Sequence, residues 1–248
     1  HAVLLNSCIK NNSKTKKSFE FEWSLLQANQ NDKIWHEDTS ELTQRFLLET
    51  AAEKTYFATK KIIDIGCGHG IMTTKIAELS GLAVGIELSR AVEQAYIHNQ
   101  HQDAHYLQGD LQFLPFETSS FDVLYSSGVL HHTYDTRNSL HLVEPVLKKE
   151  GRICLWLYHP QKSLIHNLLL QIRNITKRLP VKVAFVFLSV FLFPFSFLIK
   201  KVKNKRSVNY REEMIDLLDG FTPEFRHEIT HEAATEWLHE LGYRSVKI

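Results

Sequence analysis

The chain has 248 residues, 44% of them hydrophobic and 23% charged, which is enough for one α/β domain with a full core plus an appendage. Its formal net charge of +1 excludes a chain that is basic or acidic throughout, yet residues 151–211 hold twelve Lys and Arg and no acid. The remainder holds seventeen basic residues against 28 acidic ones, a balance of −11, so residues 151–211 form a distinct segment.

The cysteines and the first residues bear on the compartment. Cys8, Cys67 and Cys154 are too few and too scattered for a disulfide framework or a four-ligand metal site, so we expect no metal. The opening "HAVLLNSCIK" has neither a basic start nor a long apolar run, and it predicts no secretory signal. We therefore expect a reducing, cytoplasmic setting.

The N-terminal segment, residues 1–59, divides into two parts. Residues 1–38 are polar, with a few aromatic anchors and no sustained periodicity, and they predict an irregular arm. The following stretch "DTSELTQRFLLETAAE" starts with three candidate cap residues and has apolar residues at Leu42, Phe46 and Leu47. This pattern predicts an amphipathic helix.

Short apolar runs then alternate with helical stretches. Strands are predicted at 61–65, 82–86, 104–108, 121–127 and 152–158, and helices around 70–80, 89–100 and 137–148. A last helix, "HEAATEWLHELG", should end at Gly242 and lead into a sixth strand over 243–248. The alternation predicts βαβ units, a doubly wound and mostly parallel sheet, and helices on both of its faces.

The segmentation expected from this pattern has three further parts. Residues 60–160 would form a ligand-binding core, and 161–210 a hydrophobic and basic helical insertion after the fifth strand. Residues 211–248 would complete the core with a helix and a strand.

The loop in "KIIDIGCGHG" (61–70) follows the first strand, where open parallel sheets bind ligands. It lacks the Lys-Ser/Thr of a phosphate-binding loop and the glycine spacing of a dinucleotide site, and Asp64 would repel phosphates. Glu87 ends the second strand, where an acid can hold ribose hydroxyls, and Asp110 follows the third. These residues predict a ligand with adenosine, a positive charge and no phosphates.

The successive motifs "DIGCGHG", "GIELS", "GDLQFLPF", "FDVLYSSGVLHH" and "LKKEGRICLWLY" resemble those of class I S-adenosylmethionine-dependent methyltransferases, with a Rossmann-like fold, over residues 60–160. The resemblance implies that the glycine loop passes under the methionine part of S-adenosylmethionine, with Asp64 facing its amino group. It also implies that Glu87 holds the ribose, Asp110 with Leu111 the adenine, and that Ser127 lies near the sulfonium. The cofactor-binding residues expected are Asp64, Gly66, Cys67, Gly68, Gly70, Glu87, Leu88, Asp110, Leu111 and Ser127.

His131 and His132 follow the fourth strand at the mouth of this site, and a neutral imidazole can act as a base near pH 7. Related enzymes have a histidine at the position of His132, so both are catalytic candidates, although they could instead cap the next turn. Tyr158 and His159 are weaker candidates.

The stretch "HEITH" (227–231) matches the zinc signature H-E-x-x-H. That signature needs both histidines on one helix. Because Thr230 is suited to be the N-cap of the last helix, we expect no zinc and a position near the acceptor pocket instead.

The insertion contains "VAFVFLSVFLFPFSFLI" (183–199), which is uncharged and has basic flanks. A membrane crossing is not expected, since strands before it and a helix after it should share one domain, and Pro194 should kink it. Three alternatives stay open: hydrophobic helices packed over the acceptor site, an apolar face lying on an anionic membrane, or an internal core of paired helices. Nucleic acid is not expected as a partner.

The sequence thus predicts an S-adenosylmethionine-dependent methyltransferase acting on a small, apolar or membrane-associated acceptor. We expect it in the cytoplasm, with peripheral contact to anionic membrane as one possibility, and leave its oligomeric state open. Two alternatives are a non-catalytic cofactor-binding regulatory or scaffolding partner, and another use of the same cofactor such as aminopropyl transfer.

Overall fold

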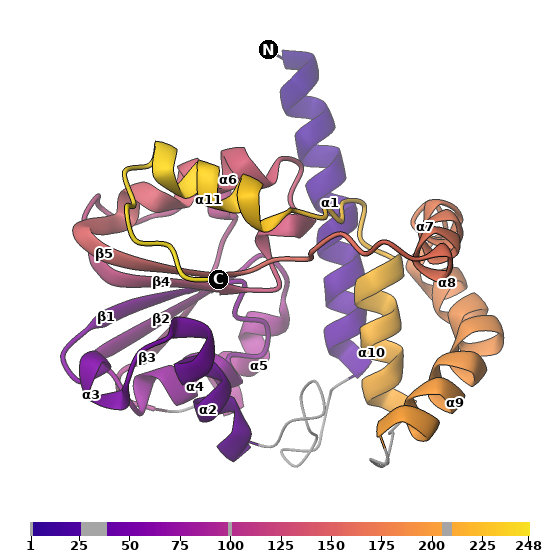
Figure 1. Cartoon of the computed structure of the whole chain (residues 1–248), viewed down its shortest axis with the longest axis horizontal. Coiled ribbons are helices and arrows are strands. Elements are labelled where there is room, and N and C mark those ends of the chain that lie inside the picture. Colours follow the sequence, from indigo (N-terminus) through magenta and orange to yellow (C-terminus); the bar gives the residue numbers. More distant parts are fainter. Residues whose placement is uncertain (1, 26–38, 99–100, 205–209) are drawn as a thin grey trace. The chain divides into compact units, whose positions relative to one another are not determined.

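The computed structural model describes residues 2–25, 39–98, 101–204 and 210–248 (Figure 1). By its internal contacts the chain divides into two compact units. The sheet unit consists of Thr39–Pro160 and His227–Ile248, and the helical unit of His1–Asp38 and Gln161–Arg226. Each unit is therefore built from two separate stretches of sequence.

The sheet unit contains a five-stranded parallel sheet in the order β3-β2-β1-β4-β5. Its strands are β1 (Lys61–Ile65), β2 (Leu82–Glu87), β3 (Ala104–Gln108), β4 (Phe121–Ser127) and β5 (Leu147–Trp156). The strand order reverses between β1 and β4, which are neighbours in the sheet. Crevices at the carboxyl ends of strands beside such a reversal are where doubly wound sheets bind ligands.

Helices cover both faces of this sheet (Figure 1). One face packs on α2 (Thr39–Thr50), α3 (Lys54–Phe57) and α4 (Ile71–Ala77), and the other on α6 (Thr136–Val143) and α11 (His231–Glu240). The strands alternate between the two cores, since Ile62 lies in one and Ile63 in the other. The remaining α-helix of this unit, α5 (Ala91–His98), contacts β2 and β3.

Most of the predicted elements of this unit are confirmed. The strands β1, β3 and β4 have the expected bounds, and α2 buries Leu42 and Phe46 as expected. The fifth strand begins earlier than predicted, at Leu147, because Leu147 pairs with Phe121 of β4 before a register shift leads to the pairing of Arg152 with Val123. The predicted sixth strand is wrong: residues 243–248, all described, form no strand.

The helical unit consists of α1 (Ala2–Leu25), α7 (Leu164–Thr176), α8 (Val181–Phe187), α9 (Phe193–Asn204) and α10 (Tyr210–Phe221). Its core is formed mainly by α10, which contributes Met214, Leu217, Leu218 and Phe221 around Leu188. We had expected the residues of α10 to complete the sheet-containing core. The structure instead groups α10 with α1, α7 and α9.

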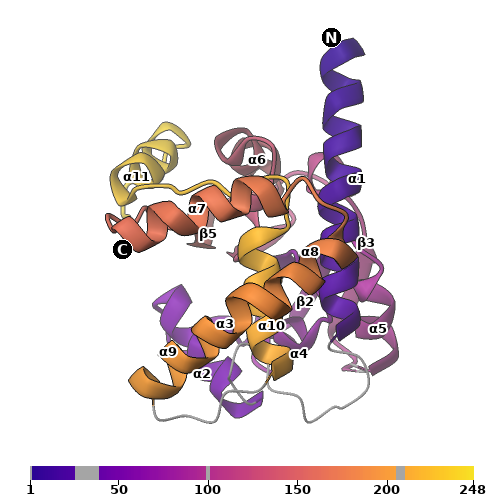
Figure 2. The ribbon, with the colours of Figure 1, turned by 90° about the vertical axis from the view of Figure 1, so that its right-hand side faces the viewer.

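The irregular arm predicted for residues 1–38 is wrong over residues 2–25, which form α1, and residues 26–38 lie outside the described part of the chain. The helix runs beside α10 in both views (Figures 1 and 2). Its buried positions include Thr15, Ser18 and Glu22, spaced three and four residues apart. Because this inward face is largely polar, the sequence carries no apolar helical period there.

Helices α8 and α9 run on from each other through a π-helical turn at Leu188–Leu192. Pro194 lies in the first turn of α9, directly after the π-helical turn. Proline has no backbone N–H to donate, so the regular hydrogen-bond pattern of the helix is interrupted there. The resulting helix, Val181–Val202, is long and apolar enough to cross a membrane: its most apolar 18 residues have a mean hydropathy of 2.2, and 11% of these residues are buried. It therefore exposes much apolar surface.

Candidate functional site

The glycine loop between β1 and α4 lies at the reversal of strand order. Gly66 has φ +80°, and a Cβ on it would lie 2.3 Å from Cγ2 of Val129, in the loop that follows β4. Gly70 has φ +73°, and a Cβ there would lie 2.5 Å from the ring of Tyr106 on β3. Any side chain would be both strained and blocked, so glycine at these positions lets Val129 and Tyr106 pack directly against the loop backbone.

Glu87, at the end of β2, holds this loop. Its Oε2 accepts a hydrogen bond from the Gly68 amide at 3.1 Å, and its Oε1 accepts one from the Ser89 amide at 2.8 Å. The side chain is buried, and burial raises its pKa against the lowering effect of these hydrogen bonds. Each carboxylate oxygen retains a second lone pair for a ligand hydroxyl.

Asp64 is a buried carboxyl group at the carboxyl end of β1. It accepts a hydrogen bond from Thr73 Oγ1 at 2.6 Å. Burial, opposed by this bond and reinforced by the charges of Glu87 and Glu49, raises its pKa to about 7. In contrast, burial lowers the pKa of His69, on the glycine loop, to about 4. The local field therefore favours a cation, and His69 itself carries no charge near pH 7.

The other predicted cofactor residues follow the ends of β1, β2 and β3, and some of them stabilise the local structure there. Asp110 caps the 3-10 turn Leu111–Phe113 by accepting a hydrogen bond from the Gln112 amide at 3.0 Å. Leu88 and Leu111 are half-buried. Cys67 is buried, and burial raises the pKa of its thiol, which keeps it protonated.

A polar network around Ser127, at the end of β4, was not predicted beyond Ser127 itself. Arg45 Nε donates to Glu49 Oε1 at 2.7 Å, and Arg45 Nη2 donates to Ser127 Oγ at 3.2 Å. Tyr125 donates to the second oxygen of Glu49 at 2.5 Å. The only sequence signal was an i,i+4 Arg–Glu pair flanking the buried Phe46 of α2.

His131 and His132 lie in the 3-10 turn Leu130–His132 that follows β4, and they are 0% and 3% exposed. The centroids of the two rings are 4.2 Å apart, and the His131 ring is 4.2 Å from Tyr158. Trp156 also contacts this group, with 42% of its surface exposed. The two candidate bases thus belong to a covered aromatic cluster beside a partly exposed tryptophan.

The segment "HEITH" packs against the same cluster. The His227 amide donates to the His131 carbonyl at 2.9 Å, and the Ile229 amide donates to the Tyr158 carbonyl at 2.7 Å. Thr230 caps α11 by accepting from the Ala233 amide, so His227 precedes the helix as predicted. Among the described residues no group of three His, Cys, Asp or Glu is arranged to hold a metal ion.

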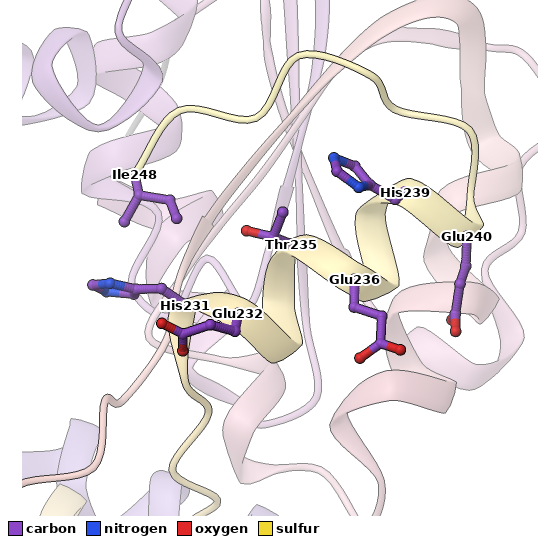
Figure 3. Close-up of a pocket in the computed structure, with 7 residues that line it drawn as sticks. All are labelled: His231, Glu232, Thr235, Glu236, His239, Glu240 and Ile248. Carbon is purple, nitrogen blue, oxygen red and sulfur yellow. The ribbon is translucent and has the colours of Figure 1, made fainter.

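Figure 3 shows an open depression elsewhere on the sheet unit, along one side of α11. It is lined by His231, Glu232, Thr235, Glu236, His239, Glu240 and Ile248. Glu240 is held there by a bidentate ion pair with Arg137. None of the predicted cofactor residues lines this depression, so it is separate from the glycine-loop site.

A family model described as "Methyltransferase domain" matches residues 63–155. The chain is 31% identical over 116 residues to the mitochondrial ubiquinone biosynthesis O-methyltransferase of Schizosaccharomyces pombe, covering 44% of this chain and 42% of that protein. It is 33% identical over 107 residues to demethylmenaquinone methyltransferase of Lactococcus lactis, covering 40% and 42%. It is 28% identical over 130 residues to 27-O-demethylrifamycin SV methyltransferase of Amycolatopsis mediterranei, covering 49% and 48%.

The chain thus spans less than half the length of these curated relatives. Among solved structures, it is similar to the YcgJ protein of Bacillus subtilis, with a TM-score of 0.49 and 18% identity, covering 83% of this chain and 85% of that one. It is also similar to a putative methyltransferase of Bacillus halodurans, with a TM-score of 0.45 and 22% identity, covering 56% and 60%.

Proposed function

Residues 63–155 carry the methyltransferase domain of the class I S-adenosylmethionine-dependent family, and we propose that the sheet unit transfers a methyl group to a small apolar acceptor. Members of this family use S-adenosylmethionine as the methyl donor. Relatives named for ubiquinone biosynthesis and for demethylmenaquinone support a small molecule as acceptor. The partly exposed Trp156 beside Tyr158 supports an apolar one.

The single observation that carries this proposal is the pair of buried carboxyl groups, Asp64 and Glu87, beside the glycine loop. At Gly66 and Gly70 the missing Cβ lets Val129 and Tyr106 pack directly on the loop, which holds its backbone at the carboxyl edge of the sheet. Asp64 and Glu87 supply buried carboxyl groups that a cationic adenosine compound would stabilise in the charged form. When bound, S-adenosylmethionine supplies a methyl carbon attached to a sulfonium, which is open to in-line displacement.

We assign the residues of the chain the following roles. Asp64 would pair with the amino group of the methionine part, and Glu87 would accept hydrogen bonds from the two ribose hydroxyls. Asp110 would accept from the adenine amine. Alignment of the acceptor with the methyl carbon is the main contribution of the chain, because the leaving sulfide needs no acid.

We propose His132 as the base that removes the acceptor's proton, with His131 packed beside it. A neutral imidazole suits this role near pH 7. Since the His132 side chain is 3% exposed, the acceptor would have to displace part of the aromatic cover to contact it. The same burial favours a second candidate function, a non-catalytic cofactor-binding protein located in the cytoplasm like the proposed enzyme.

The first test is calorimetry with S-adenosylmethionine and S-adenosylhomocysteine. Both should bind, and Glu87→Gln should weaken binding at least about tenfold, because loss of a charged acceptor costs about 1.5–3 kcal/mol. Glu93→Gln is the matched control, since Glu93 is an exposed acid on α5 paired with Arg90. Binding of NADH with no binding of either sulfur compound would contradict the proposal.

The second test separates enzyme from binding protein. The protein with labelled methyl donor would be offered lipid-soluble and water-soluble metabolite fractions. We expect label in the lipid-soluble fraction, and a lower kcat with unchanged cofactor affinity in His132→Gln. Turnover that His132→Gln leaves intact would remove His132 from the base role, and no turnover with any fraction would support the non-catalytic alternative.

A further inference from the structure

The long helix Val181–Val202 of the helical unit has two different faces. Its inner face is buried at Ala184 and Leu188, and Leu188 packs with Met214 and Leu218 of α10 in the core of the unit. Figure 2 shows α8 and α9 continuing as one rod next to α10, in agreement with the contacts between them. This inner face accounts for the position of the helix within its own unit.

Polar contacts hold the same inner face along most of its length. Ser189 Oγ lies 3.1 Å from the Tyr210 hydroxyl, and Ser196 donates to Glu213. Lys200 Nζ lies 2.7 Å from Glu213 Oε2 and 2.6 Å from Asp216 Oδ2. Against the effect of burial, these hydrogen bonds raise the pKa of Lys200. A helix that crossed a bilayer alone would have to give up all of these contacts, leaving the buried Glu213 without its cation.

The outer face of the helix is apolar and exposed. Its members are each more than half exposed and recur at helical spacing: Val183, Val186, Val190, Phe191, Phe195, Leu198, Ile199 and Val202. Helix α7 of the same unit exposes Leu164, Ile165, Leu168 and Ile175. We call these twelve side chains the apolar face. Twelve large exposed apolar side chains on two helices of one unit exceed the scattered apolar residues of an ordinary surface and indicate an interaction site.

The charged residues that neighbour the apolar face in the sequence are all positive. Exposed cations flank it at Lys162, Arg178, Lys182 and Lys201, and residues 151–211 contain no acid. Of the four acids of α10, Glu213 and Asp216 are engaged by Lys200 on the inner face. An apolar centre with a cationic rim complements an anionic lipid surface, whereas a second copy would bring like charges together. Nucleic acid would leave the apolar centre uncovered.

We propose that the apolar face docks on an anionic bilayer surface, with the helix Val181–Val202 lying in the plane of the interface rather than crossing it. The aliphatic and Phe side chains would enter the boundary between headgroups and acyl chains, and the flanking cations would contact anionic headgroups. Lys200 stays on the inner face and takes no part. This docking concerns the helical unit alone and is independent of the proposed methyl transfer.

The test is flotation of the full chain with vesicles of phosphatidylcholine, with or without phosphatidylglycerol. We expect binding to the anionic vesicles that falls steeply as salt is raised from about 0.05 to 0.5 M, because the Debye length shortens. Ile199→Glu should weaken it at least about tenfold, since a charge on the face must be kept from the acyl region. Ile97→Glu is the matched control: Ile97 lies on α5 of the sheet unit and is 55% exposed, against 52% for Ile199.

The cations have a separate test. Lys182→Gln with Lys201→Gln should reduce the salt dependence, whereas Lys54→Gln with Lys149→Gln, two exposed lysines of the sheet unit, should not. Circular dichroism and S-adenosylmethionine affinity should be unchanged in all variants, which separates failure of docking from failure of folding or of the proposed function.

Three outcomes would overturn the inference. The first is no flotation with anionic vesicles, or flotation that Ile199→Glu leaves intact. The second is a concentration-dependent dimer that Ile199→Glu abolishes, which would identify a second copy as the occupant. The third is resistance to alkaline extraction from vesicles, which would indicate a crossing helix.

Discussion

The sheet unit and the helical unit both bury polar side chains, but they use them differently. In the sheet unit, Asp64 and Glu87 collect at the carboxyl edge of the strands. In the helical unit, Arg173 donates to the Pro223 carbonyl at 2.8 Å and Thr176 to the Phe221 carbonyl at 2.9 Å. Polar groups there join helix to helix.

The two units also differ in where their apolar side chains point. The sheet unit encloses them in two cores, one on each face of the sheet. The helical unit has one small core around α10 and leaves the apolar face outside. The difference teaches that buried polar groups indicate a ligand site in the sheet unit but internal structure in the helical unit. In the helical unit, it is the exposed apolar face that indicates an interaction site.

The largest expected effect contrasts a glycine from each unit. Gly66→Ala should weaken S-adenosylmethionine binding at least about thirtyfold, because the positive φ and the displaced Val129 together cost about 2 kcal/mol or more. Gly220→Ala, on α10, meets no atom within 4 Å of its new Cβ, and it should stabilise its helix by about 0.5–1 kcal/mol. Calorimetry and urea unfolding measure the two effects, and equal losses of cofactor binding would contradict the contrast.

The next effect concerns pH and belongs to the sheet unit only. Since the Asp64 pKa is about 7, a cationic ligand must displace its proton at lower pH, so affinity should rise up to about tenfold per unit as pH increases toward 7 and level off above it. Asp64→Asn should weaken binding and abolish this slope. Calorimetry between about pH 5.5 and 8.5 measures it, and a slope retained by Asp64→Asn would assign the titration to another group.

The same raised pKa has an opposite consequence for the free protein. The folded state binds the Asp64 proton more tightly than the unfolded chain, whose ordinary value is 3.8. This contribution to the free energy of unfolding is full below that value and is lost as the pH rises toward about 7. In Asp64→Asn, this part of the decrease in the free energy of unfolding with rising pH should be absent.

The smallest effect concerns the helical unit. Ser18 on α1 shares a buried hydrogen bond with Thr222, which also donates to the Leu218 carbonyl. Ser18→Ala should therefore lower the free energy of unfolding by only about 0.5–1 kcal/mol, and cofactor affinity should not change. Ser24→Ala is the control, since Ser24 is exposed on the same helix. A change in cofactor affinity with Ser18→Ala would contradict the independence of the two units.

The sequence predicted the sheet more completely than the helices. Strands such as β1 and β4 are continuous apolar runs with glycine or polar residues at their ends, so their bounds follow from composition. The helix α1 could not be predicted, because Thr15, Ser18 and Glu22 occupy the positions where apolar residues would reveal the period. Its partner α10 also lies far away in the chain: Ser18 of α1 shares a hydrogen bond with Thr222, which directly follows α10 and is 204 positions away.

The candidate site shows the same division. The glycines, Asp64 and Glu87 could be predicted because spacing along the chain fixes their place at strand ends. The hydrogen bonds of Arg45 and Glu49 with Ser127 could not, since they join α2 to the end of β4 across 82 and 78 positions of the chain. The burial of His131 and His132 depends on the segment 227–229, which returns to them from beyond the helical unit.

The pairing of α1 with α10 also sets an order of assembly during translation. Helix α1 is made before α10, but its contacts wait until Thr222 and Glu224 have been synthesised, and the separation between Lys14 and Glu224 is 210 residues. The five strands of the sheet leave the ribosome before that point. The helical unit is therefore completed only after all five strands have been made, and until then α1 and the long apolar helix expose the surfaces that α10 will cover, which makes this interval prone to aggregation and suited to capture by a chaperone or a membrane.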